Sequence, residues 1–206
     1  MGLPEMDIAF VLYPNMTALD LVGPYEVLAS IPGIRSHFVA ETRDAVSADR
    51  GLTMVPTTTF AEMDRADVVV VPGSGHWKEA LEQQPMIDWL RKVHPTTKYT
   101  TSVCTGSTLL AAAGLVDVAT THWAVRDLLA SQGVEVSTDR VVESGKVITA
   151  AGVSAGIDMA LRLVAMEFTD AGAKTVQLAI EYFPEPPFTQ DEIGPEIAEG
   201  LKALLG

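Results

Sequence analysis

Short runs of β-branched and other apolar residues alternate along the chain with longer windows in which apolar residues recur at helical spacing. This alternation is typical of an α/β protein, in which helices cover both faces of a mostly parallel sheet. Strands are predicted at residues 8–13, 37–40, 52–55, 68–71, 99–103, 140–143 and 146–149. Helices are predicted at residues 19–29, 78–84, 86–93, 105–113, 124–131, 154–167, 170–180 and 195–205. Ser144 and Gly145 join the last two strands, so a hairpin at or near the edge of the sheet is expected.

The size and composition of the chain fit one domain. Its 206 residues are 48% hydrophobic and 20% charged, which is enough apolar material for a core. The stretch between Tyr182 and Pro195 is rich in proline and acidic residues, and too little chain follows it to fold alone. We therefore expect a single domain over residues 1–206, with the C-terminal segment 182–206 forming an extended strap plus a helix.

The charge balance and the cysteine content exclude several classes of protein. There are 14 Lys and Arg residues against 27 Asp and Glu residues, a net charge of −13, so the average surface repels nucleic acids and anionic lipids. The chain has no run of about 18 apolar residues, the length that a membrane-spanning helix needs. Its single cysteine cannot form an internal disulfide, and its first residues do not resemble a secretory signal. We predict a cytoplasmic protein that binds neither nucleic acid nor a membrane.

The cysteine lies in the most informative segment, KYTTSVCTGSTLLAAA at residues 98–113. The predicted strand stops at Cys104 and an apolar helix follows at once, so the thiol is expected in a sharp turn at the carboxyl end of the sheet. The N–H groups that begin the helix are expected to lower the pKa of the thiol from about 8.5, so that it is mostly ionised. Alternatively the residue fills the core, since free cysteine is among the most buried residue types.

A second candidate is Asp20, which has apolar neighbours in NMTALDLVGPYE at residues 15–26. A solvated loop does not need such neighbours, which favours a functional carboxyl group. Aspartate also favours helix starts, so Asp20 is alternatively an N-cap. If the strands at 8–13 and 99–103 are adjacent in the sheet, Asp20 and Cys104 converge at one end of it.

Five sequence blocks, in order, resemble the DJ-1/PfpI superfamily. They are LDLVGPYEVLAS at 19–30, VVVPGSG at 69–75, TSVCTGS at 101–107, TTHWA at 120–124 and AAGVSAGIDMAL at 150–161. Within that superfamily the combination is most similar to the isocyanide hydratases. The resemblance spans nearly the whole chain. It implies a flavodoxin-like, class I glutamine amidotransferase-like sandwich with a nucleophile elbow, and a homodimer.

The resemblance places the family's nucleophilic cysteine at Cys104 and its partner acid at Asp20. Many members carry glutamate at the acid position, whereas aspartate fits the hydratase branch. The protease-like branch has a histidine directly after the cysteine, where this chain has Thr105. The implied reaction is hydration of a small isocyanide, R–N≡C, to an N-substituted formamide. Cys104 would attack the terminal carbon, Asp20 would protonate it as general acid, and water would hydrolyse the resulting thioimidate.

Several further residues are candidates for supporting roles at this site. Thr105 either hydrogen-bonds there and steadies charge through its amide, or is an ordinary first-turn residue. Gly73, Ser74 and Gly75 either bring backbone N–H groups to the substrate or form an ordinary strand-to-helix turn. Gly152, in a run of small residues, is expected to approach the pocket.

The histidines do not suggest a metal site. His122 is predicted to be mainly structural, because no acid partner for it is evident. His37, His76 and His94 show no metal-ligand spacing with one another or with Cys104. No metal and no cofactor are predicted.

Two other functions stay open. A glyoxalase or deglycase activity is the nearest enzymatic alternative, and aspartate at position 20 weakens it. In a non-enzymatic ligand-sensing or redox-sensing domain, Cys104 would be a contact or an oxidation site, because exposed cysteines of low pKa readily form sulfenic acid.

Overall fold

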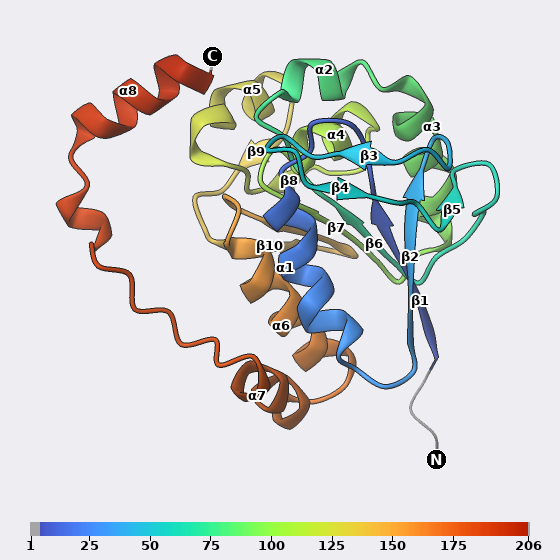
Figure 1. Ribbon diagram of the computed structural model, residues 1–206. Coiled ribbons are helices and arrows are strands. Elements are labelled where there is room, and N and C mark those ends of the chain that lie inside the picture. Colours follow the sequence, from blue (N-terminus) through green and yellow to red (C-terminus); the bar gives the residue numbers. More distant parts are fainter. Residues whose placement is uncertain (1–4, 206) are drawn as a thin grey trace.

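A computed structural model describes residues 5–205 (Figure 1). Within these residues the largest sheet has seven strands in the order β10-β11-β7-β6-β1-β2-β5. Neighbouring strands are parallel except β10 and β11, which form an antiparallel hairpin at one edge. The mostly parallel sheet and the hairpin at its edge, both predicted from the sequence, are therefore confirmed.

The strands of this sheet are β1 (Met6–Val11), β2 (Ile34–Ala40), β5 (Thr58–Thr59), β6 (Val68–Val71), β7 (Tyr99–Val103), β10 (Val141–Ser144) and β11 (Val147–Ala150). Two small sheets pair β3 (Val46–Ser47) with β4 (Thr53–Met54), and β8 (Val118–Ala119) with β9 (Glu135–Val136). The strand predicted at 52–55 is thus the two-residue β4, which lies outside the main sheet. Leu52 and Val55 on either side of it are exposed, so this segment does not bury the apolar surface that a core strand buries.

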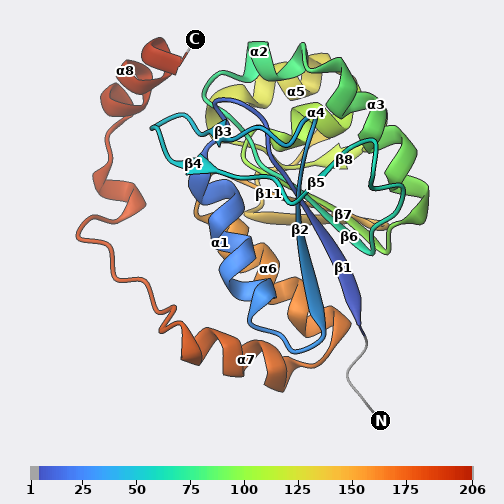
Figure 2. The same cartoon turned by 45° about the vertical axis from the view of Figure 1, so that its right-hand side comes forward.

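Helices cover both faces of the main sheet. They are α1 (Ala18–Ala29), α2 (Trp77–Leu81), α3 (Gln84–Val93), α4 (Gly106–Ala112), α5 (Arg126–Ser131), α6 (Ala155–Glu167), α7 (Asp170–Ala179) and α8 (Pro195–Leu205), with 3-10 turns η1 (His94–Thr96), η2 (Trp123–Val125) and η3 (Gln190–Glu192). Helices α1 and α6 lie side by side on one face, and α3 and α4 lie on the other (Figure 2). The helix predicted at 124–131 begins instead as the 3-10 turn η2 and becomes α-helical only at Arg126.

The order of the central strands does not meet the condition on which Asp20 and Cys104 were expected to converge. Strand β6 lies between β1 and β7, so the first strand and the strand that leads to Cys104 are not adjacent. The chain first moves outward from β1 to β2 and then returns to the other side of β1, a reversal that local sequence patterns do not reveal. All three strands still end at the same edge of the sheet, because they are parallel to one another.

Strands β6 and β7 hold that edge rigidly in place. All four valines of β6 are fully buried, and so is the end of β7 from Thr101 to Val103. Continuous burial on both faces is what a central parallel strand requires, and it matches the unbroken VVVV run of β6.

The C-terminal segment follows a different course from the rest of the chain. Beyond α7 it runs along the outside of the molecule without regular structure until η3, and α8 then comes to lie near α5 (Figure 1). Phe183, Phe188 and Ile193 in this segment are more than half exposed. Within residues 5–205, no helix combines the length and the apolar character needed to cross a membrane.

Candidate active site

Cys104 occupies the turn between β7 and α4. Its backbone has φ 59°, in the left-handed region that residues other than glycine adopt at a cost of about 1–3 kcal/mol. The turn is held because the N–H of Cys104 donates to the carbonyl groups of Ala150 and Ala151, at 3.1 and 2.9 Å. The hydroxyl group of Thr121 donates to the Cys104 carbonyl at 3.0 Å. The strained strand-to-helix turn predicted from the sequence is present.

The helix that follows this turn packs unusually close to the neighbouring strand. A Cβ atom on Gly106 would lie 2.4 Å from the carbonyl oxygen of Val71, so only glycine fits at this position. This contact brings the beginning of α4 against the end of β6. The loop that begins at Pro72 is thereby placed beside Cys104 and Thr105.

Asp20 lies in the first turn of α1 and is fully buried. The N-cap of this helix is Thr17, so the alternative that Asp20 is the N-cap is wrong. The N–H of Gly73 donates to Oδ2 of Asp20 at 2.8 Å, and the carboxyl group lies beside the thiol of Cys104. Oδ1 is buried and has no hydrogen-bond partner of regular geometry among the residues described. Asp20 and Cys104 therefore meet although their strands are not neighbours, because Gly73, at the end of the intervening strand, bridges the gap.

Burial controls the protonation of both groups. It raises the pKa of Asp20 from 3.8 to about 7, and the negative charge of Asp49 acts in the same direction. The N–H of Gly73 and the thiol of Cys104 oppose this rise by favouring the carboxylate. Near neutral pH the Asp20 carboxyl group can therefore hold or release a proton.

The expectation that the pKa of the thiol is lowered is wrong. Burial raises the pKa of Cys104 well above its ordinary value, and the charge of Asp20 raises it further. The N–H groups of Val153 and Thr105 act on the sulfur in the opposite direction, as predicted for the start of a helix, but they are outweighed. The resting site thus holds a protonated thiol, and a thiolate becomes favourable only when Asp20 carries the proton.

The loop after β6 supports the site more than it faces a ligand. The N–H of Ser74 donates to the hydroxyl oxygen of Thr105 at 2.8 Å, and that hydroxyl donates to the Ser74 carbonyl at 3.0 Å. The N–H of Gly73 donates to Asp20. Two of the three expected backbone donors, those of Gly73 and Ser74, therefore have acceptors within the protein. Gly75 lines the cavity, and its N–H has no acceptor in residues 5–205. Of the three N–H groups, that of Gly75 is the one left for a ligand.

Gly152 and His122 lie against each other at the side of the site. A Cβ atom on Gly152 would lie 2.8 Å from Cδ2 of His122, so the glycine makes room for the ring; Val153, rather than Gly152, lines the cavity. Nδ1 of His122 accepts the N–H of Ala124 at 3.3 Å, the structural role that was predicted. Burial lowers the pKa of His122, with the charge of Arg126 acting in the same direction, so the ring is neutral with its proton on Nε2.

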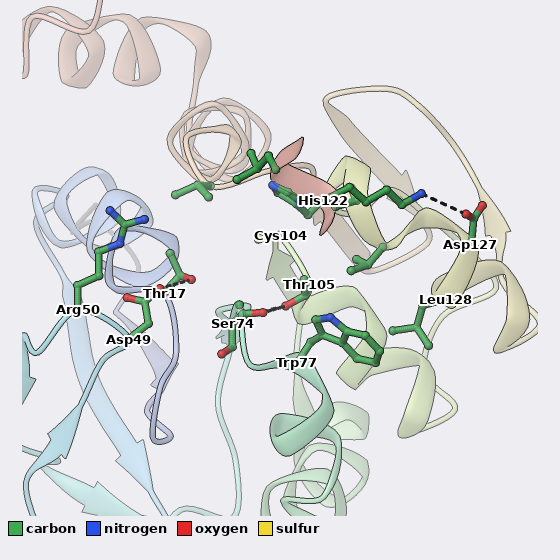
Figure 3. Close-up of a pocket in the computed structure, with 16 residues that line it drawn as sticks. Thr17, Asp49, Arg50, Ser74, Trp77, Cys104, Thr105, His122, Asp127 and Leu128 are labelled. Atoms are coloured by element: carbon green, nitrogen blue, oxygen red, sulfur yellow. Dashed lines mark hydrogen bonds and ion pairs between the residues drawn. The ribbon is translucent and has the colours of Figure 1, made fainter. Parts of the chain in front are cut away.

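The thiol opens into a cavity of about 390 Å³ (Figure 3). One end is formed by Cys104, Thr105 and Val153, and side chains of Trp77 and Leu128 line another part. Further lining residues come from the loops before α1 and between β3 and β4 and from the ends of α5 and α8: Thr17, Asp49, Arg50, Val125, Asp127, Leu201 and Lys202. These lining residues could not be predicted from the sequence, because they come from segments far apart in the chain and share no motif.

The cavity has no donor set for a metal. In the part of the chain that the structure describes, no group of three or more His, Cys, Asp or Glu side chains could hold a metal ion. The chemistry available at the site is that of a thiol, a carboxyl group of raised pKa, a neutral imidazole and backbone N–H groups.

Comparison with known proteins finds relatives over most of the chain. The model of the DJ-1/PfpI family matches residues 6–166. The chain is 43% identical over 185 residues to the isonitrile hydratase of Pseudomonas putida, an alignment that covers 89% of this chain and 81% of that protein. It is 27% identical over 162 residues to the glutathione-independent glyoxalase DJR-1.2 of Caenorhabditis elegans, covering 76% of this chain and 86% of that protein.

A solved structure extends the likeness to the whole chain. The crystal structure of a ThiJ/PfpI family protein from Pseudomonas syringae matches with a TM-score of 0.93 and 36% sequence identity, covering 100% of this chain and 87% of that one. The flavodoxin-like α/β fold predicted from the sequence blocks is confirmed by this match together with the parallel sheet. The chain belongs to the DJ-1/PfpI family.

Proposed function

We propose that this protein is an isocyanide hydratase, which converts R–N≡C and water to an N-substituted formamide. The observation that carries the proposal is the pair formed by Cys104, which lines the cavity, and the fully buried Asp20 beside it, with the pKa of Asp20 raised to about 7. Isonitrile is another word for isocyanide, so the identity of 43% to an isonitrile hydratase supports the same reaction. It implies a small-molecule substrate and a lyase of the hydratase class.

In the first step, the pair adds across the terminal carbon of the isocyanide. The proton shared by the two groups moves to Asp20, which leaves a thiolate held by the N–H groups of Thr105 and Val153. The thiolate forms a bond to the carbon, and Asp20 gives its proton to the same carbon. The product is a thioimidate, R–N=CH–S–Cys104, with Asp20 now a carboxylate. Oδ1 of Asp20, buried and without a partner, is the atom suited to carry the transferred proton.

In the second step, water attacks the thioimidate carbon. The Asp20 carboxylate accepts one proton from the water as general base and passes it to the nitrogen, which gives the adduct R–NH–CH(OH)–S–Cys104; its hydroxyl group holds the second proton of the water. The C–S bond then breaks, and the formamide R–NH–CHO leaves while the pair regains one proton. Atoms balance, because the water contributes the formyl oxygen and the two hydrogens that the cycle has consumed.

Thr105 is proposed to act in both steps through its backbone and its side chain. Its N–H steadies the sulfur, and its hydroxyl group fixes the loop of Ser74 so that Gly73 stays on Asp20. The N–H of Gly75 is available to hold a polar atom of the bound substrate. His122 supports the wall near Val153 and takes no part in proton transfer.

The experiment that tests the proposal mixes the purified protein with an aryl isocyanide and follows formamide formation by chromatography. We expect turnover that is proportional to enzyme concentration. Methylglyoxal is offered to the same preparation in parallel, with D-lactate as the measured product. Turnover of methylglyoxal but not of the isocyanide would replace the proposal with the glyoxalase alternative. Turnover of neither would favour a sensing role for Cys104.

The pH dependence of the reaction follows from the raised pKa of Asp20. Below about 7 the pair holds two protons, and above it one proton remains to be shared. Because the productive form carries one proton, we expect kcat/KM for the isocyanide to rise about tenfold per pH unit below 7 and to level off above it. A profile from about pH 5 to 9 checks this, and a rate that does not change across pH 7 contradicts it.

Gly73→Ala is expected to lower kcat/KM for the isocyanide at least about a hundredfold. A Cβ atom there would lie 2.5 Å from the N of Thr105 and 3.0 Å from Oδ2 of Asp20, so the two groups must move apart. Displacing catalytic groups by about 1 Å costs about a hundredfold in rate. Gly200→Ala is the matched control, because a Cβ atom on Gly200 meets nothing within 4 Å and Gly200 does not line the cavity. Equal activities for the two variants would show that the bridge through Gly73 does not matter.

The oligomeric state, the compartment and the domain organisation stay predictions. We expect a homodimer in the cytoplasm, with residues 1–206 forming one domain and 182–206 its strap and helix. Light scattering after size-exclusion chromatography measures the mass in solution, and a mass equal to one chain would exclude the dimer.

A further inference from the structure

The C-terminal helix α8 forms part of the wall of the cavity that contains Cys104. Leu201 and Lys202 of α8 line the cavity, although every other lining residue comes from positions 17–153. Helix α8 reaches this place from the far side of α7 through the strap that carries Phe183 and Phe188 (Figure 1). The C-terminal segment therefore does more than cover the outside of the molecule.

The attachment of α8 to the domain is weak. The ion pair between Lys202 and Asp127 has a distance of 3.6 Å (Figure 3), and the two side chains are 55% and 94% exposed. Exposed pairs of this kind contribute little and are screened by salt. Leu201, the residue before Lys202, is the apolar side chain by which α8 lines the cavity.

The cavity is lined by apolar side chains as well as by the charged pair of Lys202 and Asp127. Trp77, Val125 and Leu128 line it together with Leu201, and Figure 3 shows Trp77 and Leu128 on the same side of the cavity as Asp127. Leu201 is 44% exposed, so an apolar group bound here would remove part of it from water. The reacting carbon must lie at the other end, next to Cys104, so the part of a substrate that extends towards α8 is its R group.

We propose that Leu201 is a specificity-determining residue that selects isocyanides with an uncharged apolar R group of aryl size. This inference rests on the proposed hydratase function. An aryl group fills the space between Leu201 and the side chains of Trp77 and Leu128, whereas a methyl group remains at the Cys104 end. Leu201 therefore contributes to the binding of the larger substrate and leaves the chemical step unchanged.

The test compares Leu201→Ala with Ile197→Ala, using phenyl isocyanide and methyl isocyanide. Ile197 lies one helical turn before Leu201, is 57% exposed and does not line the cavity, so its variant controls for loss of an apolar side chain from α8. We expect Leu201→Ala to raise KM for phenyl isocyanide about five- to tenfold, with kcat unchanged and both constants for methyl isocyanide unchanged. Ile197→Ala should match the wild type on both substrates. An unchanged KM ratio of phenyl to methyl isocyanide in Leu201→Ala would overturn the inference.

A second readout separates this inference from the proposed function. Absence of turnover with either isocyanide counts against the hydratase proposal alone. The role of Leu201 is then tested by alkylation of Cys104. Cys104 is the single cysteine of the chain, so mass spectrometry reports its reaction with N-phenylmaleimide and N-methylmaleimide without ambiguity. We expect Leu201→Ala to slow the phenyl reagent severalfold relative to the methyl reagent. If the ratio of the two rates equals that of the wild type, Leu201 does not discriminate between R groups.

Discussion

Cys104→Ala is expected to abolish isocyanide hydration, lowering kcat/KM by about four orders of magnitude or more. Without the sulfur there is no covalent intermediate, and water would have to attack an isocyanide carbon that has not been activated. Asp20 and the cavity remain, so substrate binding should persist while turnover is lost. Formamide release over several hours, at enzyme concentrations near that of the substrate, gives the sensitivity that this comparison needs.

Cys104→Ser provides the matched variant for this prediction. Serine retains the shape of the side chain and a hydrogen-bonding atom, but its hydroxyl group is a far weaker acid than a thiol, and in the proposed mechanism His122 takes no part in proton transfer. We expect it to be as inactive as Cys104→Ala. Thermal unfolding close to that of the wild type should show that both variants are folded. Formamide production by Cys104→Ala at the wild-type rate would exclude the thioimidate route.

Asp20→Asn is expected to have two opposite effects, loss of activity and gain of stability. Activity should fall about 10²- to 10⁴-fold, because an amide cannot donate a proton to the isocyanide carbon. Stability should rise because the fully buried carboxylate is costly in the folded protein. The pKa of Asp20 is raised from 3.8 to about 7, so removing the ionisable group relieves about 4 kcal/mol above pH 7, at about 1.4 kcal/mol per pH unit.

The sign of this stability change depends on pH. The folded state binds the Asp20 proton more tightly than the unfolded state, so the cost is absent below about pH 4, grows between 4 and 7, and is complete above 7. Chemical denaturation at pH 4 and pH 8 should therefore show that Asp20→Asn is more stable than the wild type only at the higher pH. Asp88→Asn, which removes an exposed carboxylate paired with Arg91, is the control and should change stability by less than about 0.5 kcal/mol at either pH. A variant that is less stable than the wild type at pH 8 would contradict this explanation of the raised pKa.

The fold was largely predictable because its signals are local. The VVVV run of β6 has the bounds expected for it, and the turn at Cys104 was identified from a strand, small residues and an apolar helix in immediate succession. Helix α8 also has the bounds predicted for it, Pro195–Leu205. Such features depend on neighbouring residues, so one sequence is sufficient to find them.

The features that were missed or predicted wrongly depend on distant parts of the chain. The order of strands around β1 is set by packing, and β6 lies between the two strands whose adjacency was the condition for Asp20 and Cys104 to meet. The N–H of Thr105, at the start of α4, acts on the thiol as expected, but desolvation by the surrounding protein has the larger effect on its pKa. Trp77 and Leu201 reach the cavity through tertiary structure alone, and no spacing in the sequence connects them to Cys104.

The position of α8 also matters for how the protein is produced. Strand β1 starts at the amino edge of the parallel sheet, whereas α8 ends beside the cavity at the opposite edge (Figure 1). An affinity tag fused after α8 would place additional polar chain next to the substrate entrance and compete with the weak ion pair of Lys202. Kinetic measurements on this protein should therefore use a tag before β1, or a C-terminal tag that is cleaved off before assay.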